Sequence, residues 1–264
     1  MLPTKTFIIP TYNPDIEYLK IAIISIINQM TSSDILQIHD DRSQNIGQIS
    51  KLCQNLQNKF SENEIVFIAH NENVGITKGL NRALQYVDTP FFAIFGQDDV
   101  SKYDLPWDKY DQLLLRNLDI DVFLFRTEFI DANDRVISPI TQDTILSHTY
   151  YPTRFSLALG WGNYKNKIVY AVQGAFFRTG NVKFDERFPT EDHPIFLEKA
   201  TTNSVLLSNF QSSQYRRHHG QSTANVWSFL RTDINIVWQY LPIHQFLIVA
   251  VKKIIQRIIQ RIKL

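Results

Sequence analysis

Two pairs of adjacent aspartates suggest where this chain could bind a metal ion. Asp40–Asp41 and Asp98–Asp99 each come directly after a short apolar run. Crowded carboxylates repel one another unless a cation lies among them, and hard oxygen ligands suit Mg²⁺ or Mn²⁺ bridging a diphosphate. A zinc site would need His and Cys spacings that the sequence lacks. The alternative is that each pair caps a helix or hydrates a turn, but two such pairs favour a site.

A third acidic pair, Glu191 and Asp192, lies in "FPTEDHPIFLEKA", between a turn-rich stretch and an amphipathic segment. The pair therefore falls near the start of a predicted helix. Acidic residues stabilise a helix at that end, which is one explanation for the pair. The other explanation is a carboxylate base that takes a proton from an attacking hydroxyl group.

Apolar runs and helical spacings alternate through the first hundred residues. The predicted strands are 5–10, 34–40, 64–70 and 91–96, and the predicted helices are 13–29, with Asn13 as its cap, 46–60 and 76–87. This order predicts an α/β fold with a mainly parallel sheet and helices on both of its faces. Ligands of such sheets bind beyond the carboxyl ends of the strands, where both aspartate pairs fall.

Composition limits the classes of protein that the chain can belong to. With 264 residues and 44% hydrophobic residues, it can form one large domain or two fused lobes, and its formal charge of +1 argues against a general nucleic-acid role. Cys53 is the only cysteine, so an internal disulfide is excluded, and we expect its side chain to be buried. We see no secretion signal and no run of about 20 apolar residues, and we expect a cytoplasmic protein.

The turn after the first strand reads "PTYN" and has no glycine. A dinucleotide-binding turn would need G-x-G-x-x-G at this place. Five stretches in order instead resemble the family 2 glycosyltransferases of the GT-A fold, which are mostly inverting enzymes that transfer a sugar from a nucleotide donor. The stretches are "FIIPTYN", "IHDDRS", "NENVGITKGLNRAL", "FGQDDV" and "FPTEDHPIFLEKA", and the similarity covers residues 5–220.

This resemblance implies roles for residues of the first turns. Thr11 and Tyr12 would line the nucleotide pocket, with the Tyr12 ring against the base and Pro10 shaping the turn. Asp41 would accept a hydrogen bond from the base. Arg42 stands where the family motif "DDGS" has glycine.

The resemblance also implies contacts to the sugar and the diphosphate. Asn73 and Gly75 would form a tight loop before a helix that points side chains at the donor, with Asn81 completing the pattern. Lys78 on this helix would meet the diphosphate, or be a solvated lysine. Gly174, in "VQGAFFRTG", would allow close approach of the backbone to the donor sugar.

The metal motif of the family is D-x-D, and here Gly96 replaces its first aspartate. By this match Asp98 would hold the sugar or ribose, and Asp99 would hold a divalent cation, Mn²⁺ or Mg²⁺. A histidine of "QYRRHHGQST", either His218 or His219, would complete the metal or diphosphate site.

Inverting transfer further implies a base on the acceptor side, for which we assign Asp192, with Glu191 orienting it or binding the acceptor. Arg216 and Arg217 would be partners of the phosphates, or part of an exposed basic turn. The cation would neutralise the leaving diphosphate.

The C-terminal stretch "VKKIIQRIIQRIKL" has the pattern of a basic amphipathic helix. It is too short and too charged to span a bilayer, so we expect it to lie on an anionic membrane surface; the alternative is a helix docked on the domain or in a dimer. With the resemblance, a membrane-bound helix implies an acceptor on a polyprenyl diphosphate lipid, as in bacterial capsule or O-antigen synthesis.

The sequence therefore predicts a GT-A-like enzyme at the cytoplasmic membrane face. It divides into a nucleotide-sugar half (1–100), an acceptor half (101–222) and a helical tail (223–264). The donor would be a UDP-, dTDP- or GDP-sugar and the acceptor a glycan or lipid-linked glycan. Two alternatives remain: a nucleotidyltransferase, which would be expected to have a glycine-rich turn with arginine after its first strand, and a non-catalytic nucleotide-binding scaffold.

Overall fold

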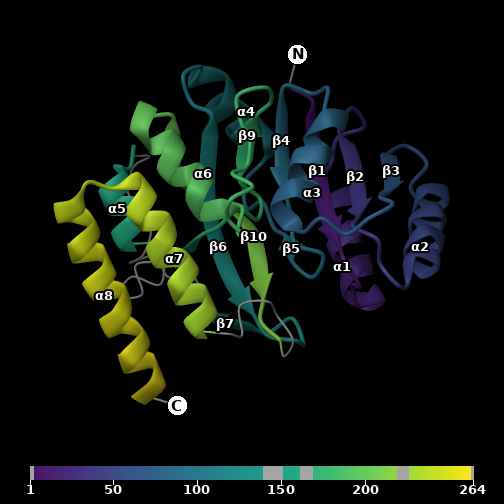
Figure 1. Cartoon of the computed structure of the whole chain (residues 1–264). Helices are drawn as coiled ribbons and strands as arrows, with labels where there is room; N and C mark the ends of the chain where they lie inside the picture. The colour runs from purple at the N-terminus through teal and green to yellow at the C-terminus, as the bar shows by residue number, and fades with distance from the viewer. Residues whose placement is uncertain (1–2, 139–150, 161–168, 219–225, 263–264) are drawn as a thin grey trace.

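A computed structural model describes residues 3–138, 151–160, 169–218 and 226–262 of the chain. Within these residues ten strands form a single sheet, in the order β3-β2-β1-β4-β9-β6-β10-β5, with β7 and β8 paired to β6 (Figure 1). This is the mixed, mainly parallel sheet flanked by helices that the sequence predicts. The sheet continues across residue 100, because β4 pairs with β9.

The first half of the sheet is parallel. Its strands are β1 (Lys5–Thr11), β2 (Ile35–Asp40), β3 (Glu64–Ala69) and β4 (Phe91–Ile94). The intervening helices are α1 (Ile16–Ile27), α2 (Ile46–Lys59) and α3 (Ile76–Ala83), the last continued by the 3-10 turn η1 (Leu84–Tyr86). The side chain of Asp15, not the predicted Asn13, caps α1 by accepting from two backbone N–H groups.

The second half adds antiparallel pairs. Its strands are β5 (Val100–Ser101), β6 (Val122–Ile130), β7 (Val136–Ser138), β8 (Val169–Tyr170), β9 (Phe176–Arg178) and β10 (Val205–Arg216). Its helices are α4 (Trp107–Arg116), α5 (Arg154–Gly160), α6 (Asp192–Lys199), the 3-10 turn η3 (Ala200–Thr202), α7 (Val226–Tyr240) and α8 (Ile243–Ile262). Strand β6 pairs in parallel with β10 and antiparallel with β9.

Two apolar cores form, one on each face of the sheet, because side chains alternate along each strand. In β1, Phe7 and Ile9 enter the core under α1, α2 and α4, whereas Ile8 enters the core under α3, α5, α6 and α7. Cys53 is buried in the first of these cores, as predicted, and burial raises the pKa of its thiol to about 12.

Helices α7 and α8 lie beside α5 and α6, at the end of the molecule far from α2 (Figure 1). Buried side chains of both helices, Val237 and Val249 among them, belong to the core that also contains α6. The tail is thus packed onto the sheet domain. Among the described residues, no helix combines the length and apolar character needed to cross a membrane.

Candidate functional site

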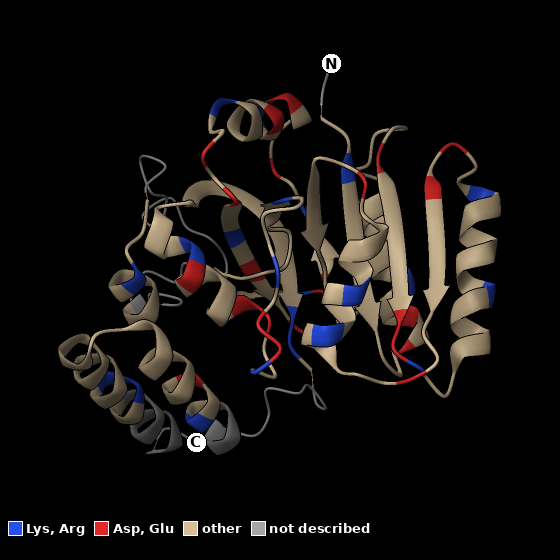
Figure 2. Ribbon diagram, turned by 45° about the horizontal axis from the view of Figure 1, so that its top comes forward, with Lys and Arg blue, Asp and Glu red and all other residues tan. Residues whose placement is uncertain are grey.

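The carboxyl ends of β1, β2 and β4 meet at one edge of the sheet, where acidic residues gather (Figure 2). Hydrogen bonds join the loops that follow these strands. The backbone N–H of Tyr12 donates to Gln97 Oε1 at 2.9 Å, and the N–H of Asp41 donates to the carbonyl of Thr11 at 2.8 Å. The predicted base-binding turn and the predicted metal motif are therefore neighbours.

The turn after β1 leaves one large side chain in solvent. Tyr12 is 50% exposed, whereas Thr11 is buried and its hydroxyl donates to the Asp40 carboxylate at 3.3 Å. The half-buried Pro10 precedes them. Asn13 adopts a left-handed conformation (φ 46°), which asparagine tolerates better than most residues, so the turn needs no glycine. Of the two residues predicted to line the pocket, the structure presents Tyr12 and places Thr11 in a supporting position.

The turn after β2 holds the loop between β3 and α3 in place. The Asp41 carboxylate accepts hydrogen bonds from the backbone N–H groups of Val74 and Gly75, the shortest at 2.9 Å. Asn73 Oδ1 accepts from the Gly75 N–H at 3.2 Å. Arg42 has φ 65°, so it adopts the left-handed conformation for which the family motif has glycine. The structure thus brings Asp41, Asn73 and Gly75 together, with the Asp41 carboxylate bound to the backbone of the loop.

Helix α3 carries two of the residues singled out in the sequence, and their surroundings differ. Lys78 is exposed, so its ammonium can move in solvent. Asn81 does not face solvent freely: its amide nitrogen donates to the Phe184 carbonyl and its oxygen accepts from the Phe184 N–H, each at 2.9 Å. Asn81 therefore ties the donor-side helix to the segment that leads to Glu191.

The turn after β4 places its two aspartates in different surroundings. Asp99 is 1% exposed, and its Oδ1 accepts from the backbone N–H of Arg216 at 3.0 Å. Burial, and then the neighbouring charge of Asp98, hold the pKa of Asp99 well above its usual range. A Cβ at Gly96 would lie 2.4 Å from Asp99 Oδ2, so the Asp99 carboxylate fills the space that a side chain there would need.

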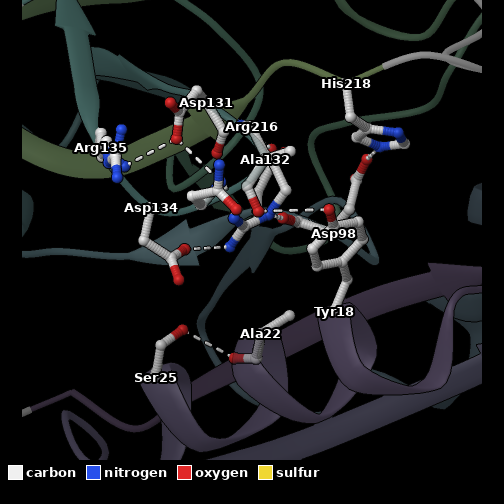
Figure 3. Close-up of polar contacts among 12 residues, drawn as sticks. Tyr18, Ala22, Ser25, Asp98, Asp131, Ala132, Asp134, Arg135, Arg216 and His218 are labelled. Carbon is white, nitrogen blue, oxygen red and sulfur yellow. Dashed lines mark hydrogen bonds and ion pairs between the residues drawn. The ribbon is translucent and has the colours of Figure 1, made fainter.

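Asp98, by contrast, is 22% exposed and its Oδ2 lies 2.7 Å from Nε2 of His218 (Figure 3). The His218 ring also lies against Tyr18 of α1, with ring centroids 5.3 Å apart. Two donor groups that suit a divalent cation thus stand together near solvent. The described residues contain no group of three or more His, Cys, Asp or Glu side chains arranged for a metal ion. His219 lies outside the described residues.

Arg216 is buried behind the Asp98–His218 pair and contacts the residues around it. It is fully buried, its Nε donates to the Asp98 carbonyl at 2.8 Å, and its guanidinium forms a 2.6 Å ion pair with Asp134 and covers the Tyr18 ring (Figure 3). These contacts remove Arg216 from the phosphate role suggested for it. Arg217 is exposed, with its guanidinium 4.0 Å from the Phe129 ring centroid.

Gly174 lies beside the end of β4, where its N–H donates to the Ile94 carbonyl. Its φ is 73°, and an added Cβ would come within 2.6 Å of Ser212 Oγ. The backbone conformation and the packing against β10 therefore both require glycine at this position, independently of any contact with a donor sugar.

The third acidic pair lies at the start of α6. Glu191 and Asp192 are both half-buried, and Glu191 makes no side-chain cap for the helix, which weakens the capping explanation. Burial, and then the charge of Asp192, raise the pKa of Glu191 to about 8. Burial also raises the pKa of Asp192, although the neighbouring His193 opposes the shift. Raised carboxyl pKa values are typical of general acid–base sites.

A cavity of about 480 Å³ opens between the loop that precedes this pair in the chain and helix α7. The loop residues Arg187, Phe188 and Pro189 form one wall, and Arg231 and Trp238 of α7 belong to another. Trp238 is 54% exposed, so one ring face is accessible. The sequence does not indicate this cavity, because its walls come from a loop and a helix that are far apart in the chain.

The model of glycosyl transferase family 2 matches residues 6–179, which is more than half of the chain. The chain belongs to glycosyl transferase family 2. An uncharacterized glycosyltransferase of Methanocaldococcus jannaschii is 29% identical over 137 residues, which are 51% of this chain and 45% of that protein. The match thus spans less than half the length of this relative.

Solved structures share the GT-A-type fold. Residues 1–349 of TarS from S. aureus, in complex with UDP-GlcNAc, superpose with a TM-score of 0.63 at 15% identity, over 95% of this chain and 71% of that one. The mannosyltransferase PcManGT from Pyrobaculum calidifontis, in complex with GDP-Man and Mn²⁺, gives a TM-score of 0.60 at 12% identity, over 96% and 69%. At these identities the similarity establishes the fold.

Proposed function

We propose that this family 2 member transfers a sugar, with inversion, from a nucleotide-sugar donor to a hydroxyl group of a glycan or lipid-linked acceptor. One observation carries the proposal: Tyr12, the loop held by Asp41 and the Asp98–His218 pair converge at one edge of the sheet. Such an edge is where α/β folds bind nucleotides.

The donor would lie along this edge. The exposed Tyr12 ring offers a flat apolar face to the base, and the exposed loop at Asn73 and Gly75 lies next to it. Lys78 and Arg217 are exposed cations that can approach the phosphates. UDP, dTDP and GDP donors all fit this description, and the two related structures bind UDP-GlcNAc and GDP-Man.

A divalent cation fits the carboxylate and imidazole donor set of Asp98 and His218. We place the cation on Asp98, whereas the family resemblance implies Asp99. The Asp98 side chain reaches solvent, but the Asp99 carboxylate is buried and accepts a hydrogen bond from the backbone N–H of Arg216. When bound, the cation would neutralise charge on the leaving diphosphate. Mn²⁺ in the related mannosyltransferase structure supports this assignment.

Asp192 is the proposed base. The acceptor oxygen attacks the anomeric carbon while the bond from that carbon to the diphosphate breaks, and the hydroxyl proton passes to the Asp192 carboxylate. Its raised pKa suits a group that must gain a proton near neutral pH, and Glu191 would orient it or bind the acceptor. The cavity between α7 and the loop that precedes the pair would give the acceptor a place to bind.

The acceptor would be presented at a membrane. Helix α8 exposes apolar side chains, among them Ile243, Leu247, Ile248 and Val251, and the tail carries lysines and arginines. Such a surface suits the inner face of an anionic membrane and an acceptor on a polyprenyl diphosphate, as in surface polysaccharide synthesis.

The first test is a thermal-shift panel of UDP, dTDP, GDP and CMP, each with and without Mn²⁺. We expect one nucleotide to stabilise the protein in a Mn²⁺-dependent way, and Asp98→Asn to abolish the Mn²⁺ dependence. Asp108→Asn, at an exposed site on α4, is the matched control. The absence of a shift with every nucleotide would contradict the donor site.

A second test separates the enzyme from the non-catalytic scaffold. Asp192→Asn should abolish release of the nucleoside diphosphate from the donor while nucleotide affinity stays unchanged. A scaffold would keep its biological activity in this variant. Loss of nucleotide binding would mean that Asp192 belongs to the donor site.

A further inference from the structure

A buried polar bridge joins three helices next to the acidic pair. Nδ1 of His193, the second residue of α6, lies 2.6 Å from Oδ1 of Asp233 in α7. The other carboxylate oxygen of Asp233 lies 2.6 Å from Nζ of Lys253 in α8. The three side chains are only 5%, 12% and 13% exposed, so the bridge lies inside the helical layer.

The bridge reaches the proposed base through a single residue. His193 follows Asp192 directly, and its backbone N–H donates to Asp192 Oδ1 at 2.6 Å. A proton must lie between Nδ1 of His193 and the Asp233 carboxylate at their short separation, so Asp233 fixes the tautomer and the orientation of the ring. A carboxylate thereby positions a histidine that adjoins the base.

Besides the bridge, the burial of Ile195 and Phe196 in the core holds the start of α6. The helix has eight residues, and Glu191 at its N-cap provides no side-chain hydrogen bond to the first turn. A helix this short depends on tertiary contacts for its position. Its far end has an ion pair of its own, Lys199 with Asp121 at 3.1 Å, so the two ends are held separately.

We propose that Asp233 and Lys253 are positioning residues of the active site, which hold Glu191 and Asp192 in place through His193. This inference rests on the proposed function of the acidic pair. It makes the last two helices part of the catalytic unit, because the lysine of the bridge belongs to the same helix as the expected membrane-binding surface.

The electrostatics of the bridge support this role. The charged and titratable groups around Asp192 are Glu191 and His193 on its own segment, Asp233 on α7 and, through Asp233, Lys253 on α8. The charge of Asp233 contributes to the raised pKa of Asp192, whereas His193 and Lys253 lower the pKa of Asp233 to about 2 despite its burial. Asp233 therefore stays ionised while Asp192 can gain a proton.

The test compares Asp233→Asn with Asp121→Asn, a matched control that breaks the ion pair at the other end of α6. The substrate is the nucleotide-sugar whose nucleotide stabilises the protein, and the readout is release of nucleoside diphosphate. For Asp233→Asn we expect turnover to fall by about 10²-fold, since a small misplacement of a catalytic group has this effect. Nucleotide affinity should not change, and the ascending limb of the pH–rate profile should move to lower pH as Asp192 loses a negative neighbour.

A second readout does not depend on turnover. Backbone amides of Glu191, Asp192, His193 and Ile195 should exchange with deuterium about tenfold faster in Asp233→Asn than in Asp121→Asn; Pro194 has no amide hydrogen. Lys253→Gln, which breaks the outer end of the bridge, should show the same pattern to a smaller degree and serves if Asp233→Asn does not fold. Equal exchange at 191–195 in the two aspartate variants, or equal turnover, would overturn the inference. A wild-type protein that turns over no donor would instead count against the proposed function, and the exchange experiment would still decide the inference.

Discussion

At the scale of single residues, two glycines of the donor side both leave room for a Cβ but differ in backbone conformation. Neither Gly75 nor Gly79 has an atom within 4 Å of an added Cβ, but Gly75 has φ 80° and ψ 168°, whereas Gly79 lies inside α3. Gly75→Ala should lower the free energy of unfolding by about 1–3 kcal/mol, because only glycine adopts that conformation readily. Gly79→Ala should raise it by about 0.5–1 kcal/mol. Urea denaturation measures both, and equal effects would contradict the argument.

The acidic pair gives a second prediction at this scale. The folded-state pKa of Glu191, about 8, lies above its unfolded value, so the folded state binds more protons than the unfolded state between about pH 4.5 and 8. The contribution of Glu191 to stability therefore falls as pH rises through that window. Glu191→Gln should be more stable than wild type by a margin that grows from pH 5 to pH 8 in thermal melts. A constant margin would place the Glu191 pKa near its usual value.

Residue types and spacing predicted the acidic turns but not their internal geometry. Asp98 and Asp99 are equivalent in the sequence. Only the fold determines that the Asp99 carboxylate packs against Gly96 while the Asp98 carboxylate forms a hydrogen bond with His218. The same holds for Arg216 and Arg217, which alternate at the end of a strand so that one is buried and the other exposed. A pattern read along the chain cannot distinguish such neighbours, because their surroundings come from strands that are distant in sequence.

At the scale of elements, α3 joins the donor side to the segment before the acidic pair. The amide of Asn81 binds the backbone N–H and carbonyl of Phe184, and the Thr77 hydroxyl donates to the Phe188 carbonyl at 2.9 Å. Asn81→Ala should cost about 1–3 kcal/mol in stability, because it leaves buried backbone groups unpaired. Asn58→Ala, on the exposed face of α2, is the control and should change stability little. Equal denaturation midpoints for the two variants would mean that solvent replaces the Asn81 contacts.

The order of elements was predictable for the parallel half and less so for the rest. Alternating apolar strands and amphipathic helices specify β1 to β4 locally. Strand β9 has three residues and lies between β4 and β6 by antiparallel pairing, which no local pattern indicates. The bridge from His193 to Asp233 was equally invisible, because an aspartate in an amphipathic helix normally faces solvent.

At the scale of the whole molecule, the exposed apolar side chains of α8 raise the question of membrane binding. A membrane-bound helix needs apolar area as well as basic charge, each basic residue adding roughly 1 kcal/mol near an anionic surface. Leu247 and Val251 are 54% and 56% exposed and lie four residues apart, on one face of α8. Replacing both with serine should remove this apolar contact without disturbing the core, because neither is buried.

Cosedimentation with vesicles of anionic and of neutral lipid checks this prediction. The wild-type protein should pellet with anionic vesicles, less so at high salt, and the Leu247→Ser/Val251→Ser variant should stay in the supernatant. Leu115→Ser/Leu118→Ser, which removes two exposed leucines at the end of α4 and just beyond it, is the matched control and should pellet like wild type. Pelleting of all three proteins would show that α8 is not the anchor. Pelleting of none would favour a helix that docks on a second copy, which sedimentation velocity of the same variants would then detect as a loss of dimer.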